Sequence, residues 1–277
     1  MKIIEKYVVG KKSNSDICED IIATSNDFIA VFDGVSSKTG IRYNGKTTGY
    51  IAVELMSNAL KFVPSKANAI ECLHNINHSV YKWYKDEGLF DDVKKNPQNR
   101  PAASVAIYSR HYNQVWILGD CQVFFDSKRY TFPLRIDQLY IDIRMKVIDY
   151  LKAIGKTTEE LLQNDISAKV LRPLFEMQPT LQNSNNKNHY SYSILDGFNF
   201  CETNVHVLQL SNGVKEVSLA TDGYPVIFGS LKESEDYLKQ VLINDPLCCD
   251  IFKHLKGAYK GQNSFDDRAY VRFLIDE

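Results

Sequence analysis

Acidic residues stand at the ends of apolar, strand-like runs in this sequence. The run from Phe28 to Phe32 is rich in aromatic and β-branched residues, which is typical of a buried strand, and it leads into Asp33 and Gly34. A strand end would hold the Asp33 carboxylate on a rigid base, while Gly34 allows a sharp turn and leaves its carbonyl accessible. This arrangement suits a metal ligand. A single Asp-Gly pair is also a common hairpin-turn signal, so repetition of the pattern matters.

The pattern recurs at four other predicted strand ends. The acidic residues there are Asp222, which is followed by Gly223; Asp120; the pair Glu19 and Asp20; and the pair Asp266 and Asp267. Like charges brought together raise one another's pKa, so such a cluster persists mainly where cations neutralise it. Oxygen ligands are those that Mg²⁺ and Mn²⁺ require. A structural role, in which acids cap helices and turns, explains single residues but not the repetition.

Composition excludes several classes of function. The 277 residues contain 33 Lys and Arg against 34 Asp and Glu, a balance that argues against nucleic acid or an anionic membrane as partner. No apolar run approaches the roughly 20 residues that span a bilayer, and the N-terminal residues do not resemble a signal peptide, so a cytoplasmic protein is expected. The six cysteines lack zinc-site spacing and are expected to be reduced.

Short strands begin the chain, and helices then occur in pairs between further strands. The predicted strands are 2–9, 17–24, 28–33, 102–109, 114–118, 122–126, 190–195, 204–210, 216–221 and 268–275. The predicted helices are 47–62, 66–86, most of 137–175, 233–243 and 247–259. This order predicts one α+β domain over residues 1–277, with antiparallel sheets covered by helical layers.

Six short segments together resemble the metal-dependent protein phosphatases of type 2C. They are Glu19-Asp20, Ala30 to Gly34, Ala102 to Ala106, Gly119 to Gln122, Ala220 to Gly223, and Asp266 to Ala269. Each segment alone is a weak signal, but their order and rough spacing match the family over almost the whole chain. The resemblance implies a four-layer α-β-β-α sandwich, in which two antiparallel sheets are flanked by pairs of antiparallel helices.

The resemblance also implies a centre that holds two Mg²⁺ or Mn²⁺ ions. Asp33 would bridge both ions, and Gly34 would offer its carbonyl. The remaining implied ligands are Asp222 and Asp266 for one ion, Glu19 and Asp20 through waters, and Asp120 with Asp222 for a weaker third ion. Phosphate monoesters would be hydrolysed by direct attack of a water that bridges the two ions, without a phosphoenzyme. The implied substrates are phosphoserine and phosphothreonine in a protein partner, in a signalling role.

Several positions depart from the family pattern. An arginine that usually holds the substrate phosphate is replaced by Ser15, and Lys11 or Lys12 would substitute for it only loosely, because lysine lacks the bidentate guanidinium fork. A histidine common after the Asp-Gly pair is also missing. By analogy with the family, residues 137–177 are expected to form a helical flap-like insertion that faces the substrate.

These departures leave three readings open. The first is an active protein phosphatase, expected to act as a monomer. The second is a catalytically degenerate relative that keeps the fold as a binding or regulatory module. The third is a phosphatase of small phosphorylated molecules or another metal hydrolase, since a fold does not by itself determine a function.

Overall fold

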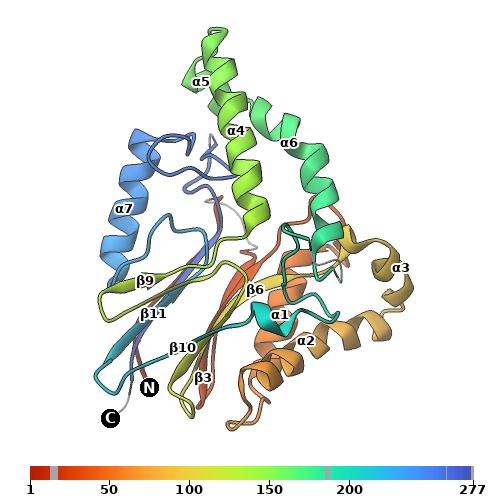
Figure 1. Ribbon diagram of the computed structural model, residues 1–277, viewed down its shortest axis with the longest axis vertical. Coiled ribbons are helices and arrows are strands. Elements are labelled where there is room, and N and C mark those ends of the chain that lie inside the picture. The colour runs from red at the N-terminus through yellow and green to blue at the C-terminus, as the bar shows by residue number, and fades with distance from the viewer. Residues whose placement is uncertain (13–17, 185–187, 260, 276–277) are drawn as a thin grey trace.

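The computed structural model describes residues 1–12, 18–184, 188–259 and 261–275. Two five-stranded antiparallel sheets pack against each other (Figure 1). The first sheet consists, in spatial order, of β10 (His206–Gln209), β7 (Gln114–Leu118), β6 (Ala103–Ser109), β3 (Phe28–Gly34) and β2 (Asp20–Thr24). The second consists of β1 (Lys2–Val9), β12 (Arg268–Leu274), β11 (Glu216–Ala220), β8 (Gln122–Phe125) and β9 (Lys128–Tyr130). The α+β class with two antiparallel sheets is confirmed.

Helices cover the outer faces of both sheets. The first sheet carries α1 (Thr48–Leu60) and α2 (Ala69–Asp86), and the second carries α7 (Leu231–Asn244) (Figure 1). A third group extends from one end of the sandwich and consists of α4 (Arg135–Ala153), α5 (Thr158–Gln163) and α6 (Ile166–Met177). The smaller elements are β4 (Arg42–Tyr43), β5 (Lys46–Thr47), α3 (Phe90–Lys95), and the 3-10 turns η1 (Pro97–Asn99), η2 (Gln178–Leu181) and η3 (Glu202–Asn204).

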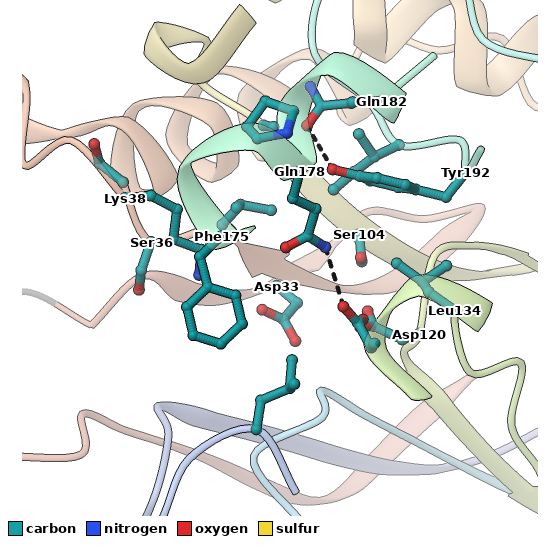
Figure 2. A pocket seen from close by; sticks show the side chains of 18 of the residues that line it. Asp33, Ser36, Lys38, Ser104, Asp120, Leu134, Phe175, Gln178, Gln182 and Tyr192 are labelled. Atoms are coloured by element: carbon teal, nitrogen blue, oxygen red, sulfur yellow. Dashed lines mark hydrogen bonds between the residues drawn. The ribbon is translucent and has the colours of Figure 1, made fainter. Parts of the chain in front are cut away.

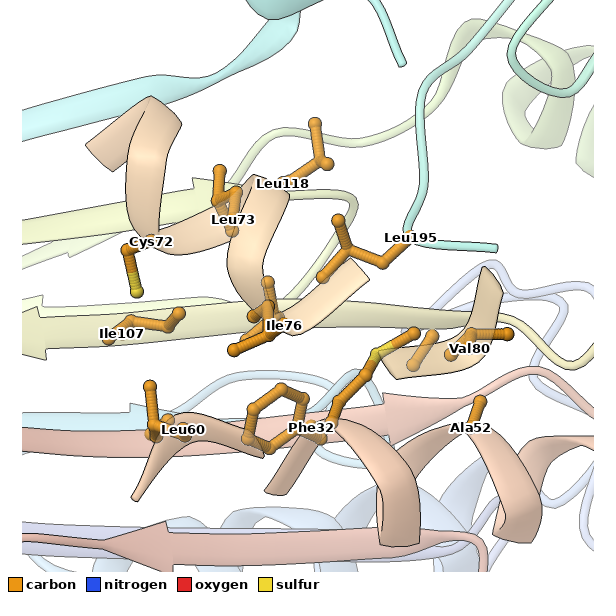
Figure 3. Close-up of a cluster of buried hydrophobic side chains, with 14 of the residues drawn as sticks. Phe32, Ala52, Leu60, Cys72, Leu73, Ile76, Val80, Ile107, Leu118 and Leu195 are labelled. Atoms are coloured by element: carbon orange, nitrogen blue, oxygen red, sulfur yellow. The ribbon is translucent and has the colours of Figure 1, made fainter. Parts of the chain in front are cut away.

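Strand β3 lies in the interior of the molecule and is buried on both faces. Phe28, Ala30 and Phe32 pack toward α1 and α2, as Figure 3 shows for Phe32. Ile29 and Val31 pack between the two sheets. The sequence of a strand that is buried on both faces is a continuous apolar run, because no solvent-facing side introduces alternating polar residues. This is why the segment that leads to Asp33 stands out in the sequence.

Local signals place the two helices on the first sheet. The Thr47 side chain accepts a hydrogen bond from the backbone N–H of Tyr50 and begins α1. Asn68 and Glu71 form a reciprocal capping box at the start of α2. The predicted boundaries of 47–62 and 66–86 agree with these elements to within a few residues.

The predicted helix at 247–259 does not form. Asp245, at the end of α7, accepts hydrogen bonds from the backbone N–H groups of four residues: Cys249, Asp250, Ile251 and Phe252. N–H groups that bind a carboxylate cannot close helical bonds to backbone carbonyls, so the segment is irregular. Among the described residues, the second sheet therefore carries α7 in place of the implied helix pair.

The predicted strand at 190–195 is also wrong. This segment has only isolated bridges, at Tyr192 and Leu195. The Asn183 side chain accepts from the N–H of Ile194 at 3.1 Å and donates to its carbonyl at 2.8 Å. A side-chain amide thus takes the place of a neighbouring strand.

The segment 137–177, predicted to be mostly helical, forms α4, α5 and α6. Tyr140 of α4 donates its hydroxyl to the carbonyl of Leu174 in α6, at 3.1 Å. Arg144 of α4 donates to the carbonyls of Leu247, Cys248 and His254, so it ties α4 to the irregular segment after α7. None of the helices among the described residues is long and apolar enough to cross a membrane.

Candidate active site

Antiparallel pairing of β2 and β3 brings two predicted site residues together. Asp20 is the register partner of Asp33, and Asp33 is in turn the partner of Ser104 in β6. Acids that precede one strand and end the next meet here because a tight turn at the other end of the hairpin sets the register. The two carboxyl groups therefore lie at the same end of the first sheet.

The second sheet contributes acids to the same place. The backbone N–H of Asp222, just after β11, donates to Asp33 Oδ2 at 3.2 Å. The preceding Thr221 donates its hydroxyl to Asp20 Oδ2 at 2.7 Å and accepts the N–H of Ala269 at 2.9 Å. These bonds join the two sheets across their acidic ends.

Two close backbone approaches require glycine. A Cβ on Gly34 would lie 2.8 Å from the backbone carbonyl carbon of Gly49, and a Cβ on Gly49 would lie 2.8 Å from Glu19 Oε1. Contacts this short exclude a side chain at either position. The glycines therefore let α1 approach the end of β3, and they bring Gly49 of α1 against the Glu19 carboxylate.

A pocket opens at this end of the sandwich. Its lining includes the predicted site residues Asp33, Gly34, Asp120, Asp222 and Asp266. Asp20 and Glu19 lie behind this lining and are buried, with 3% and 8% of their surface exposed. The structure thus brings together all seven predicted metal-site residues, although the sequence spreads them over almost 250 positions.

Burial and mutual repulsion shift the pKa values of these carboxyl groups. Burial is the larger cause that raises the pKa of Asp33 well above its usual range, and the charges of the neighbouring acids add to it. Burial also raises the pKa of Asp20 and Asp222, and the charge on Asp266 adds to both shifts. The pKa of Asp120 rises to about 6 through burial and the charge of Asp222. Without a cation, this site favours protonated acids.

Asp266 is the exception, because two lysines neutralise it. Lys11 Nζ lies 2.7 Å from Asp266 Oδ1, and Lys256 Nζ donates to Oδ2. Burial alone would raise the pKa of Asp266, but these two ammonium groups hold it below its usual range. Its carboxylate therefore faces lysines on both oxygens.

Glu19 has one carboxylate oxygen without a partner among the described residues. Glu19 Oε1 is buried and accepts no hydrogen bond, while Oε2 accepts from the Ser36 hydroxyl. A buried, unsatisfied carboxylate oxygen costs free energy unless a cation or water satisfies it. This orphaned oxygen, next to Gly49, fits an oxygen-ligated divalent ion or the waters around one.

The donor set therefore fits Mg²⁺ or Mn²⁺ on the Asp33 side of the pocket. Among the described residues, one group of three side chains offers ligand atoms within 4.8 Å of one another, and it is Asp245 with Cys249 and Asp250. Asp245 there is occupied by backbone N–H groups, which makes that cluster structural. Asp33, Asp222 and Asp266 do not converge as closely, and both oxygens of Asp266 are bound by lysines.

The two lysines predicted to contact a substrate phosphate differ in placement. Lys11 is partly buried and its ammonium group binds Asp266, with Ser36 Oγ at 3.5 Å. Lys12 is exposed and forms an isolated bridge with Gln262. Ser15, which stands in the place of the family's arginine, lies outside the described residues.

The pocket residues that were not predicted from the sequence include Lys38, Asp137, His254 and Lys256. His254 Nε2 lies 4.0 Å from Asp222 Oδ2, and burial lowers the pKa of this histidine to about 4. His254 and Lys256 were missed because a helix was predicted over residues 247–259. Asp137 carried one weak signal, as an acid at the predicted start of the flap-like insertion.

The α4–α6 segment covers one side of the pocket. Figure 2 shows Phe175 and Gln178 reaching toward the part of the pocket that contains Asp33. Gln178 Nε2 donates to Asp137 Oδ1 at 3.0 Å, and Lys38 Nζ lies 5.6 Å from the centre of the Phe175 ring. This part of the chain is therefore positioned beside whatever enters the pocket.

No protein-family model and no curated protein sequence matches the chain. Among solved structures, it is similar to the Mycobacterium tuberculosis serine/threonine phosphatase PstP/Ppp, at 12% identity and a TM-score of 0.49, over 99% of this chain and 100% of that one. The PstP catalytic domain in complex with two manganese ions gives 13% identity and a TM-score of 0.48, over 100% of each chain. Stp1 from Staphylococcus aureus gives 13% and 0.47, over 100% of this chain and 96% of that one. Likeness at this level does not establish an activity.

Proposed function

We propose that this chain is a Mg²⁺- or Mn²⁺-dependent phosphatase that hydrolyses phosphate monoesters, with phosphoserine and phosphothreonine in proteins as substrates. The observation that carries the proposal is the meeting of carboxylates from both sheets around Asp33 in one pocket. Their oxygen-only chemistry suits hard divalent ions. The order of the acidic segments in the sequence, which resembles the type 2C phosphatases, supports the same activity.

Different residues of the pocket have different roles in this proposal. Asp33 and the Gly34 carbonyl would bind the cation, and Asp222 would supply a further oxygen from the second sheet. Bound Mg²⁺ or Mn²⁺ would lower the pKa of a water and offset the charge that builds on a phosphoryl group in the transition state. Water rather than a side chain attacks the phosphorus, so no covalent phosphoenzyme forms. A cytoplasmic location, a monomeric state and a signalling role belong to the same proposal.

Hydrolysis of an aryl phosphate with Mn²⁺ titrated in tests this function. The native chain should show saturable activity. Asp222→Asn removes one anionic ligand, so the activity of this variant should be at least about a hundredfold lower, because losing one electrostatic contact to a transition state costs about 2.7–4 kcal/mol. Asp236→Asn, an exposed acid on α7 that pairs with Lys232, is the matched control and should keep full activity.

A phosphopeptide series then identifies the substrate class. Preference for phosphoserine and phosphothreonine peptides over small phosphorylated molecules supports a protein phosphatase. The reverse preference supports a phosphatase of small phosphorylated molecules instead.

Activity that survives Asp222→Asn unchanged would contradict the assigned centre.

A second candidate is a binding or regulatory module with the same fold. The specific observation in its favour is the pair of lysines on Asp266, which occupy an implied metal ligand. Ser15 in place of the phosphate-binding arginine points the same way. Metal binding by calorimetry without phosphate release from any phosphopeptide or aryl phosphate would favour this module over the enzyme.

A further inference from the structure

The Asp266 carboxylate has little capacity left for a metal ion. Its Oδ1 accepts from Lys11 Nζ at 2.7 Å and from the backbone N–H of Asp267 at 3.0 Å. Its Oδ2 accepts from Lys256 Nζ. Only 14% of the side chain is exposed, so solvent offers little competition for these bonds. A divalent ion at Asp266 would have to displace an ammonium group.

Lys11 is held in place by its own backbone. Its N–H donates to Asp267 Oδ1 at 2.8 Å, and its carbonyl accepts the N–H of Asn263 at 2.9 Å. Side-chain entropy usually weakens a lysine ion pair, and here the short distance from an anchored backbone limits that loss. The pair therefore belongs to the fold rather than to a mobile surface.

Lys256 is positioned by the irregular segment after α7. Its N–H donates to His254 Nδ1 at 3.3 Å, and the carbonyl of His254 accepts from Arg144 at 2.9 Å. The same segment is held at its start by Asp245. A helix over 247–259 would give a different backbone path, so the irregular structure itself delivers the Lys256 ammonium group to the pocket.

We propose that the ammonium groups of Lys256 and Lys11 take the place of one divalent cation at Asp266, so that the chain holds one metal ion fewer than its acidic residues imply. This inference rests on the proposed function, since it concerns the metal centre of that activity. An ammonium group neutralises Asp266 but brings no water to activate. The remaining ion belongs on the Asp33 and Gly34 side, beside the orphaned Glu19 oxygen.

The number of Mn²⁺ ions bound, measured by calorimetry and by the electron paramagnetic resonance signal of free Mn²⁺, tests the proposal. In the otherwise native chain, Asp266→Asn should leave the number of ions unchanged. Lys256→Met frees Asp266 and should add one ion. The double variant Lys256→Met with Asp266→Asn should lose that added ion.

Two controls bracket these variants. Lys239→Met changes an exposed lysine on α7 and should bind Mn²⁺ as the native chain does. Lys256→Arg keeps the positive charge and should also show no added ion. If Lys256→Met does not fold, Lys11→Met should give the added ion, and Asp266→Asn tests the inference without creating a new site.

Two results would overturn the inference. One is the loss of an ion in Asp266→Asn, which would make Asp266 a metal ligand and leave the lysines to contact the substrate phosphate. The other is an unchanged number of ions in Lys256→Met. Both measurements are independent of turnover. If Lys256→Met binds the added ion but the native chain hydrolyses no phosphate, only the proposed function is contradicted. If the native chain hydrolyses phosphate but Lys256→Met binds no added ion, only this inference is contradicted.

Discussion

Asp137 shows how burial changes the chemistry of a single carboxyl group. It lies in the first turn of α4, where the positive end of the helix dipole would ordinarily favour a charged acid. Burial nevertheless raises its pKa from 3.8 to about 7, and the charge of Asp120 adds to the shift, while Lys38 opposes it. Near neutral pH, this group changes charge beside the pocket.

The raised pKa of Asp137 predicts a pH-dependent stability in the metal-free protein. A carboxyl group with a raised folded-state pKa contributes stability that is complete below about pH 4 and is lost as pH rises through about 7. Asp137→Asn removes this loss. Urea unfolding with a chelator present should show the variant more stable than the native chain at pH 8, by about 1–3 kcal/mol, with the difference shrinking toward pH 4.

Asp142 on the same helix gives the matched comparison. Its side chain is exposed and accepts a hydrogen bond from Gln138 at 3.0 Å. Asp142→Asn should therefore differ from the native chain by the same small amount at pH 5 and at pH 8. An Asp137→Asn effect that is equally independent of pH would show that the free energy of unfolding does not depend on this titration.

At the scale of elements, the α4–α6 segment is the part of the fold best placed to contact a large substrate. It leaves the sandwich beside the pocket, and α6 with η2 directs Phe175 and Gln178 toward it (Figure 2). Val170, on the same helix, is 52% exposed and is not among the residues that line the pocket. A role as a substrate-facing flap remains a prediction.

Phe175→Ala tests that role. A packed aromatic contact contributes about 0.5–1.5 kcal/mol, so the KM for a phosphopeptide should rise about two- to tenfold while its kcat stays nearly unchanged. The KM for an aryl phosphate, which is too small to reach far along α6, should change less. Steady-state kinetics on both substrates provide the comparison.

Val170→Ala is the control on the same helix and should leave both KM values unchanged. An equal rise in KM for the peptide and for the aryl phosphate would contradict a flap role. In that case Phe175 would support the pocket itself rather than contact the part of a peptide that lies outside it.

At the scale of the whole molecule, the acidic cluster joins the two sheets. Asp20 and Asp33 belong to the first sheet, whereas Asp222 and Asp266 flank strands of the second. Repulsion among these groups opposes the packing of the two halves, and a bound cation reverses that repulsion. Metal binding should therefore stabilise the sandwich as a unit.

Mn²⁺ should raise the Tm of the native chain. An ion present at one hundred times its Kd adds about 2.7 kcal/mol to the free energy of unfolding, which corresponds to an increase of about 5–10 °C for a domain of this size. Differential scanning calorimetry with and without Mn²⁺ measures the shift. Asp33→Asn should raise the metal-free Tm, because an amide needs neither a proton nor a counter-charge in this buried site, and should abolish the shift.

An unchanged Mn²⁺ shift in Asp33→Asn would place the stabilising ion elsewhere. The cluster of Asp245, Cys249 and Asp250 is the alternative to examine, although its carboxylate already binds backbone N–H groups. Asp250→Asn separates the two locations, because it should affect the shift only if that cluster holds the ion.

Most of the strands and the candidate acids could be predicted from the sequence, because their signals are local. The buried run before Asp33 is continuous in the chain, and each acid stands at or within two residues of an end of its own strand. The capping residues of α1 and α2 act within a few positions. Patterns of this kind predict the fold class, the order of the strands in the chain and the oxygen-ligand chemistry of the site.

The pairing of Asp266 with its lysines could not be predicted in the same way. Lys11 lies 255 positions from Asp266, and Lys256 reaches the pocket because Asp245 replaces an expected helix with an irregular segment. Which ammonium group meets which carboxylate depends on the register of sheets and the path of loops. These are non-local contacts, so the charge balance of the site exists only in the folded chain.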